Sequence, residues 1–245
     1  MRGPPRHIGT GLDSTSALRH RPGKGGLEPT RGSKDSPFFP VTNYDRGGMG
    51  PPPILYNQIA EEISLQHHYS LDDNARLFAL LDVAQADAGI ACWESKYYYD
   101  YWRPVTAVRE GDTDGNANTV ADPNWEPLGA PAGGPPRDFT PPFPAYPSGH
   151  ATFGAAIFRI LELVCGSDAV EFTVKSDEVP AAPRTFHRLS DAAAENGRSR
   201  IYLGVHWNFD DVEGRAMGRK VADQVFTHRF APMLRARRRD ESFQV

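Results

Sequence analysis

The chain has 245 residues, of which 39% are hydrophobic, so it is long enough to bury one sizeable core. Its formal net charge of −4 excludes a general attraction to nucleic acid or to anionic membranes. No apolar run approaches the roughly 18 residues of a membrane span, and no apolar segment follows the N-terminal arginines. We therefore expect no membrane anchor and no secretory signal. The expected location is cytoplasmic or unknown.

The first 50 residues differ in composition from the rest of the chain. They contain 10 glycines and 6 prolines, and their apolar residues follow no period. Such a segment cannot bury enough apolar surface to offset its loss of conformational entropy. We therefore divide the chain into an irregular or disordered N-terminal arm at 1–50, a helical domain with the candidate site at 51–232, and a basic tail at 233–245.

Apolar residues at helical spacing predict a mostly helical domain. The helices are expected at about Ile54 to His68, Ser70 to Tyr101, His150 to Val164, Thr185 to Ala194 and Asp211 to Phe230. Ser70 with Asp73 resembles a capping box, and Asn196-Gly197 predicts a break or kink. Cys92 and Cys165 lie in apolar helical patterns and are expected to be buried free thiols.

Two stretches lack helical periodicity. Glu110 to Pro142 is a long loop rich in glycine, proline and aspartate, and Ser167 to Arg184 reads as an irregular linker. Loops of this length in a compact domain are usually functional or mobile. The first of them leads directly into the most informative motif of the chain.

The end of the second helix carries two cations among aromatic side chains. Lys96 and Arg103 are seven residues apart, or two helical turns, and so are expected on one face. Pro104 makes Arg103 the expected end of the helix. Two cations on one face repel each other unless an anion lies between them, although both could instead extend over apolar surface.

A hydroxyl, a glycine amide and an imidazole meet at the start of the third helix. Ser148, Gly149 and His150 directly precede the apolar pattern, and the N-terminus of a helix favours anions. The simpler interpretation is that Ser148 is an N-cap and His150 a first-turn residue.

A third group of polar residues follows the fourth helix. Arg200 and His206 are six residues apart, and Asp210 lies four residues after His206. If that segment is helical, Asp210 shares a face with His206 and can orient its ring. The alternative is a salt bridge from Arg200 beside a core histidine.

Together these groups predict a pocket for a phosphate-like anion. Arginine forks suit tetrahedral oxyanions, and a lysine adds a point charge. A serine hydrolase fits less well, because Tyr146 stands where Gly-x-Ser-x-Gly needs its first glycine. A zinc site built from His150, His206 and Asp210 is opposed by the three cations nearby.

Three ordered motifs then resemble a known signature. Lys96-x6-Arg103-Pro104, Pro147-Ser148-Gly149-His150 and Ser199-Arg200-x5-His206-x3-Asp210 are similar to the three-part signature that vanadium-dependent haloperoxidases share with type 2 phosphatidic acid phosphatases. The resemblance runs from roughly Ile54 to Pro232. It implies an all-α helical bundle of the acid phosphatase/vanadium haloperoxidase type, with a long Gly/Pro-rich active-site loop.

The resemblance also implies the roles of the matched residues. Vanadate or phosphate would be held by Lys96, Arg103, Ser148, Gly149 and Arg200. His206 would bond to vanadium or attack phosphorus, and His150 would act as the acid–base group. Lys96 would polarise the bound peroxide, and Asp210 would orient the ring of His206.

The chloroperoxidase-like branch fits this chain better than the largely membrane-spanning phosphatases do. Trp93 and Phe143 match the positions that line its halide site, and bromoperoxidases tend to carry histidine where Phe143 stands. The departure is upstream, because the family usually has a further helical region there with a carboxylate that braces the pocket arginines.

The expected activity is oxidation of halide by hydrogen peroxide to hypohalite, with vanadate as cofactor. Phosphate or sulfate fits the same pocket, and an organic acceptor and a homodimer are open possibilities. One alternative is a soluble phosphomonoesterase with a phosphohistidine intermediate. Another is an oxyanion-binding remnant that turns nothing over.

Overall fold

The computed structural model describes residues 52–127, 140–174 and 183–231. The elements in chain order are α2 (Pro52–Gln66), α3 (Leu71–Tyr99), α4 (Pro104–Arg109), the 3-10 turn η2 (Gly111–Thr113), α5 (Gly149–Cys165), β1 (Phe172–Val174), β2 (Arg184–Phe186), α6 (Leu189–Tyr202) and α7 (Asn208–His228). The predicted all-α helical bundle is therefore confirmed, with one small antiparallel sheet in which Phe172 is paired with Phe186.

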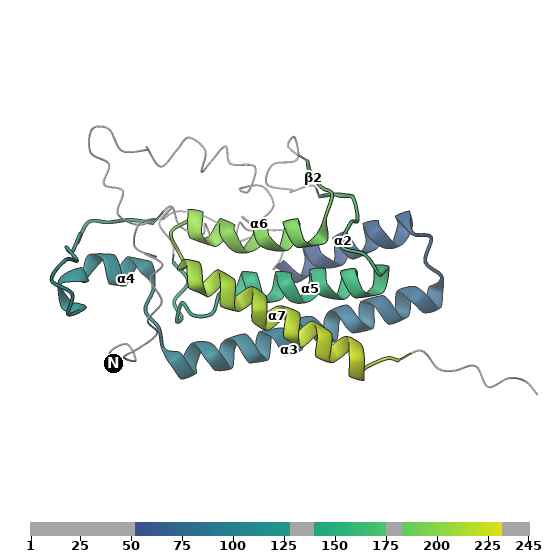
Figure 1. Ribbon diagram of the computed structural model, residues 1–245, viewed down its shortest axis with the longest axis horizontal. Coiled ribbons are helices and arrows are strands. Elements are labelled where there is room, and N and C mark those ends of the chain that lie inside the picture. The colour runs from purple at the N-terminus through teal and green to yellow at the C-terminus, as the bar shows by residue number, and fades with distance from the viewer. Residues whose placement is uncertain (1–51, 128–139, 175–182, 232–245) are drawn as a thin grey trace, which may run out of the picture.

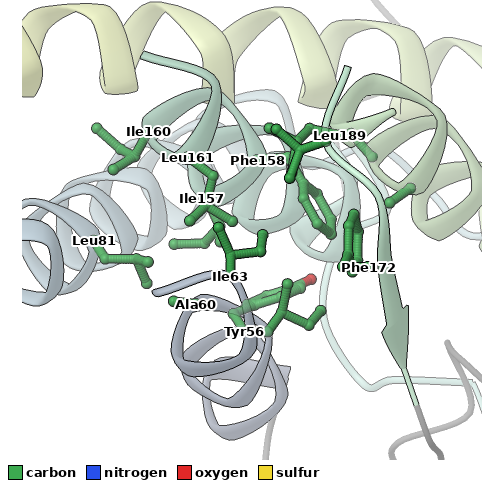
Figure 2. Close-up of a cluster of buried hydrophobic side chains, with 14 of the residues drawn as sticks. Tyr56, Ala60, Ile63, Leu81, Ile157, Phe158, Ile160, Leu161, Phe172 and Leu189 are labelled. Atoms are coloured by element: carbon green, nitrogen blue, oxygen red, sulfur yellow. The ribbon is translucent and has the colours of Figure 1, made fainter. Parts of the chain in front are cut away.

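Helix α5 is central and packs against α3, α6, α7 and α2 (Figure 1). Its buried side chains meet those of α2, α3, β1 and α6 in one apolar cluster (Figure 2). The labelled members are Tyr56, Ala60, Ile63, Leu81, Ile157, Phe158, Ile160, Leu161, Phe172 and Leu189. Because full burial of a large apolar side chain contributes roughly 1.5–3 kcal/mol, this cluster is the main source of stability.

The helix ends follow their local sequence signals. The Ser70 hydroxyl accepts from the Asp73 amide at 3.2 Å, and the Asp73 carboxylate accepts from the Ser70 amide at 3.3 Å, which completes the predicted capping box. Helix α3 ends at Tyr99, two residues earlier than expected, because Asp100 takes a left-handed conformation with φ of 45°. Gly166 ends α5 in the same way, with φ of 68°.

Helices α5 and α7 approach closely because α7 carries glycine at the contact. A β-carbon on Gly218 would lie 2.2 Å from the Thr152 carbonyl oxygen, and one on Gly214 would lie 2.9 Å from the Ser148 carbonyl oxygen. No larger residue fits without moving the backbone of α5. This contact fixes the start of α7 against the start of α5.

Three local predictions are corrected by the structure. Asn196-Gly197 causes no break, because α6 runs through both residues to Tyr202. A β-carbon on Gly197 would lie only 1.8 Å from an Asp211 carboxylate oxygen, so the glycine serves helix packing instead. Thr185 lies in β2 rather than in a helix, and the linker before it contains β1.

Arg103 does not lie on the helix of Lys96. It is the N-cap of the short helix α4, with Pro104 at the first helical position. The prediction that the two cations share one helical face is therefore wrong. The turn at residues 100–102 sets how the side chains of Lys96 and Arg103 lie relative to each other.

The domain division stays a prediction, because 1–50 and 233–245 lie outside the described residues. Cys92 is buried and Cys165 half-buried, both as free thiols. Within the described ranges, no helix has the length and apolar character needed to cross a membrane.

Candidate active site

The predicted site residues gather at one end of the bundle, where α3 and α6 finish and α5 and α7 begin (Figure 1). Helix α3 supplies Lys96, and α4 follows Arg103. Helix α5 opens with Ser148, Gly149 and His150. Arg200 lies in the last turn of α6, and the turn before α7 carries His206. Three separate stretches of the sequence thus contribute to one polar centre inside a helical bundle.

The Lys96 ammonium is buried and saturated with hydrogen bonds. Its Nζ donates to the carbonyl oxygens of Pro144 at 2.9 Å, Ala145 at 2.9 Å and Pro147 at 2.5 Å. Burial lowers the pKa of Lys96 to about 8. The cation is thus available at neutral pH, but it must release a carbonyl before it can donate to a ligand.

Arg103 is also buried, and it lies against His206. Its Nε donates to the Phe143 carbonyl at 2.8 Å, and its Nη1 donates to the Val205 carbonyl at 2.8 Å. The same Nη1 is 3.0 Å from His206 Nε2. Burial lowers the pKa of Arg103 to about 10, yet the guanidinium stays charged at neutral pH.

The loop at 140–148 explains why the cations find so many carbonyl partners. Proline has no backbone N–H, so a stretch with prolines at 141, 142, 144 and 147 has more acceptors than donors. Lys96 and Arg103 provide the missing donors. The proline spacing was visible in the sequence, although its consequence for the cations was not predicted.

His206 and Asp210 form a buried pair that fixes one tautomer. His206 Nδ1 lies 2.8 Å from Asp210 Oδ2, and the Trp207 amide donates to the same oxygen at 3.1 Å. Arg103 can only donate, so its contact requires a lone pair on Nε2 and a proton on Nδ1. Burial and the charges of Arg103, Lys96 and Arg200 lower the pKa of His206, so the ring is neutral.

The contact between His206 and Asp210 arises at a helix start rather than along a helix. His206 precedes the N-cap Trp207 of α7, and Asp210 is the third residue of that helix. Burial raises the pKa of Asp210 to about 7, opposed by the Trp207 amide and the nearby cations. The predicted orienting contact is thus present, but through helix capping geometry and not through the four-residue helical spacing.

Ser148 is the N-cap of α5, as the simpler interpretation held. Its hydroxyl oxygen accepts from the Ala151 amide at 3.4 Å, and its backbone amide donates to the Asp210 carbonyl at 3.0 Å. Acting as an N-cap leaves the hydroxyl proton available to a ligand. The N-cap role and an anion-binding role are therefore compatible.

His150 faces the same cations from the first turn of α5. Burial lowers its pKa well below the usual value, and Arg200, Lys96 and Arg103 lower it further. Among the described residues, no hydrogen-bond partner is found for the buried atoms His150 Nε2 and Arg103 Nη2. Buried polar atoms without partners among several cations fit a site built for an oxyanion.

Aromatic side chains form one wall of this centre. Lys96 Nζ lies 5.7 Å from the ring centre of Trp93 and 5.3 Å from that of Phe143, and the Arg103 guanidinium lies 5.0 Å from the Phe143 ring. The Trp93 and Phe143 rings are 5.4 Å apart. A further ring, Phe153, packs on Trp93 at 6.0 Å and was not singled out from the sequence.

Nothing in the described part of the chain resembles a cage of metal-ligating side chains, since no three His, Cys, Asp or Glu residues gather there. The donors around His206 are instead cations, a hydroxyl and helix N–H groups. This donor set fits vanadate or phosphate, whose oxygens accept hydrogen bonds.

Comparisons with known proteins agree with this geometry. Residues 76–233 match the family described as the VCPO second helical-bundle domain. The chain is 34% identical over 251 residues to vanadium chloroperoxidase of Curvularia inaequalis, and the match covers 81% of this chain and 40% of that protein.

A solved structure shows the same fold. It is titled the first bacterial vanadium-dependent iodoperoxidase, and it matches with a TM-score of 0.63 and 24% identity. The match covers 88% of this chain and 54% of that one. The chain thus spans about half the length of the relatives that it matches.

Proposed function

Because the chain belongs to the VCPO second helical-bundle family, within the haloperoxidase and type 2 phosphatidic acid phosphatase superfamily, we propose that it is a vanadate-dependent haloperoxidase. The reaction is oxidation of a halide by hydrogen peroxide to hypohalite. One observation carries the proposal. His206 carries a lone pair on Nε2 and lies among the buried cations Lys96, Arg103 and Arg200.

The three cations and the start of α5 hold the oxyanion. Arg103 turns its guanidinium from His206 Nε2 to the anion, and its unpartnered Nη2 is already available. Lys96 exchanges one of three loop carbonyls for an anion oxygen. Ser148 and the Gly149 amide donate from the positive end of the helix, where negative charge is favoured.

His150 acts as the proton carrier of the pocket. Its pKa is held low partly by Arg200, Lys96 and Arg103, and negative charge in the pocket offsets these cations. Ligand binding therefore raises the pKa of His150 and lets Nε2 accept a proton from hydrogen peroxide. When bound, vanadate supplies a Lewis-acidic centre that activates peroxide towards halide without a change of oxidation state.

Trp93 and Phe143 form the halide side of the pocket. Halides are large, polarisable and weakly hydrated, so a partly dry aromatic wall suits them. The wall also lowers the local dielectric around Lys96, which strengthens the effect of its charge on groups bound nearby. An organic acceptor of the hypohalite is compatible with this scheme.

The same atoms also support a second function, hydrolysis of a phosphomonoester. A neutral His206 with a lone pair on Nε2 is the arrangement that a histidine nucleophile needs, and phosphate resembles vanadate in shape and charge. The aromatic wall argues against this reading, because a phosphoester needs room for its leaving group and access for water.

Parallel assays on one sample separate these functions. Bromide and chloride oxidation with peroxide is measured with and without vanadate, beside hydrolysis of a phosphomonoester. We expect vanadate-dependent oxidation of bromide at least, and weak hydrolysis confined to vanadate-free protein. Strong hydrolysis that vanadate only inhibits, without halide oxidation, would establish the phosphatase. Vanadate binding without turnover in either assay would establish the oxyanion-binding remnant.

A further inference from the structure

The Trp93 ring is enclosed by two helices and a loop. Phe143 contacts it from the loop with ring centres 5.4 Å apart, and Phe153 contacts it from α5 at 6.0 Å. A β-carbon on Gly149 would lie 3.2 Å from the six-membered part of the indole, so the ring lies against the bare backbone of α5. Trp93 is only half-buried, so these three contacts hold the inner side of its ring.

The contact between α3 and α5 is reciprocal. Gly89 and Trp93 lie one turn apart on α3, and Gly149 and Phe153 lie one turn apart on α5. Each glycine faces the aromatic ring of the other helix. A β-carbon on Gly89 would lie 3.1 Å from the edge of the Phe153 ring, which is tighter than an ordinary contact. The absence of a side chain at Gly89 thus allows the Phe153 ring to pack close to α3, next to Trp93.

Phe153 reaches the cations of the site through Trp93. Lys96 contacts the rings of Trp93 and Phe143, whereas Phe153 contacts Trp93 and Gly89 and packs against the apolar cluster. A change at Phe153 therefore alters the aromatic wall beside Lys96, while the hydrogen bonds of Lys96, Arg103 and His206 stay in place. A substitution at Phe153 is therefore expected to change the preference between halides without changing the affinity for the oxyanion.

We propose that Phe153, seated over Gly89, is a positioning residue that sets the place of the Trp93 ring and thereby the halide preference of the pocket. The inference rests on the proposed function. Chloride and bromide differ in radius and in hydration, so a small shift of an apolar wall changes their relative rates. The oxyanion is held by other groups and is unaffected.

Two variants change the packing behind Trp93 in opposite ways, because one removes atoms and the other adds them. Phe153→Leu removes part of the support behind Trp93 and leaves space for the indole to retreat. Gly89→Ala adds a β-carbon against the Phe153 ring, which must give way by a few tenths of an ångström, and alanine is the better helix former at that site. Phe158→Leu is the matched control, because Phe158 lies on the same helix but packs on Tyr56 and Phe172.

The first readout is the ratio of kcat/KM for bromide to that for chloride in vanadate-loaded protein. We expect at least a fivefold change of the ratio in Phe153→Leu, a change of opposite sign in Gly89→Ala, and none in Phe158→Leu. Vanadate affinity should stay within twofold in all three variants. Ratios within twofold of the unchanged chain in both Phe153→Leu and Gly89→Ala would overturn the proposal.

The second readout needs no turnover. Iodide quenching of Trp93 fluorescence is measured with phosphate in the pocket, as the difference between each protein and the same protein with Trp93→Phe. We expect the quenching constant to change at least twofold in Phe153→Leu, but not in Phe158→Leu. If no protein oxidises halide, the proposed function fails, and an unchanged quenching constant would then reject the positioning role separately.

Discussion

At the scale of single residues, the hydrogen-bonding capacity of its neighbours decides which nitrogen of His206 carries the proton. Arg103 has no acceptor, so its contact with His206 Nε2 assigns a lone pair to that nitrogen. Asp210 accepts from Nδ1 and so stabilises the same tautomer. Two independent neighbours thus keep the lone pair on Nε2, as the proposed bond to vanadium or phosphorus requires.

Loss of Asp210 should weaken oxyanion binding. In Asp210→Ala the Nδ1 proton loses its acceptor, so the tautomer and the orientation of the ring are held less firmly, and we expect vanadate affinity to fall about 10–100-fold. Asp211→Asn is the control, because it removes the charge of the neighbouring buried carboxylate, whose partner is Arg215. Equilibrium dialysis measures both affinities. Unchanged binding in folded Asp210→Ala would make Asp210 a structural residue only.

Lys96 should make anion binding depend on pH. Its pKa is about 8, so above that pH the empty pocket loses a positive charge, and binding must then take up a proton. Sulfate is a suitable probe because it does not titrate in this range. We expect sulfate affinity to fall most steeply above about pH 8, where the decline should approach tenfold per pH unit.

The control for this pH dependence is Lys96→Met, which lacks the titrating group and should bind sulfate more weakly at all pH values. Calorimetry in two buffers of different ionisation enthalpy reports the proton uptake directly. An affinity that stays flat to pH 10 in the unchanged chain would show that Lys96 is not part of the anion site.

The sequence predicted the identity of these residues better than their contacts. Spacing and residue type marked Lys96, Arg103, Ser148, His150, Arg200 and His206. Spacing could not show that Lys96 is saturated by three carbonyls of a proline-rich loop, because that depends on tertiary packing. The roles of the residues stay predictions until binding and turnover are measured.

At the scale of elements, the site depends on close helix packing. Ser148 starts α5 and Asp210 starts α7, and the Ser148 amide donates to the Asp210 carbonyl at 3.0 Å. Gly214 and Gly218 permit this approach, since a β-carbon at either would meet the backbone of α5. Helix packing thus sets the distance between the two halves of the pocket.

Gly218→Ala should therefore harm both stability and binding. Its β-carbon would overlap the Thr152 carbonyl, which is backbone and cannot rotate away. We expect a loss of about 1–3 kcal/mol in the free energy of unfolding, measured in urea, and weaker vanadate binding in the folded fraction. Lys220→Ala on the exposed side of α7 should change the free energy by less than about 0.5 kcal/mol. An unaffected Gly218→Ala would contradict the packing argument.

Elements with strong local signals were predictable, and those set by tertiary contacts were not. The cap at Ser70 follows from side-chain chemistry and was predicted correctly. The Asn196-Gly197 pair has turn chemistry, but packing of Gly197 against Asp211 keeps it helical. The strands β1 and β2 have only three residues each, too few for a period to show.

At the scale of the whole molecule, the apolar cluster and the polar centre occupy different parts of the bundle. The cluster in Figure 2 joins α2 to the middle of α5, whereas the candidate site lies where α5 and α7 begin. Burial of apolar side chains stabilises the bundle and offsets the cost of burying Lys96, Arg103, Arg200 and Asp210.

The measurement that tests the central claim most directly is a vanadate titration of bromide oxidation in the full chain, beside His206→Ala. We predict that the rate rises with vanadate and saturates at one vanadate per chain, and that His206→Ala stays at the buffer rate at every concentration. A rate that does not depend on vanadate, or a His206→Ala protein as active as the unchanged chain, would contradict the assignment of His206 as the bonding residue of a vanadate-dependent haloperoxidase.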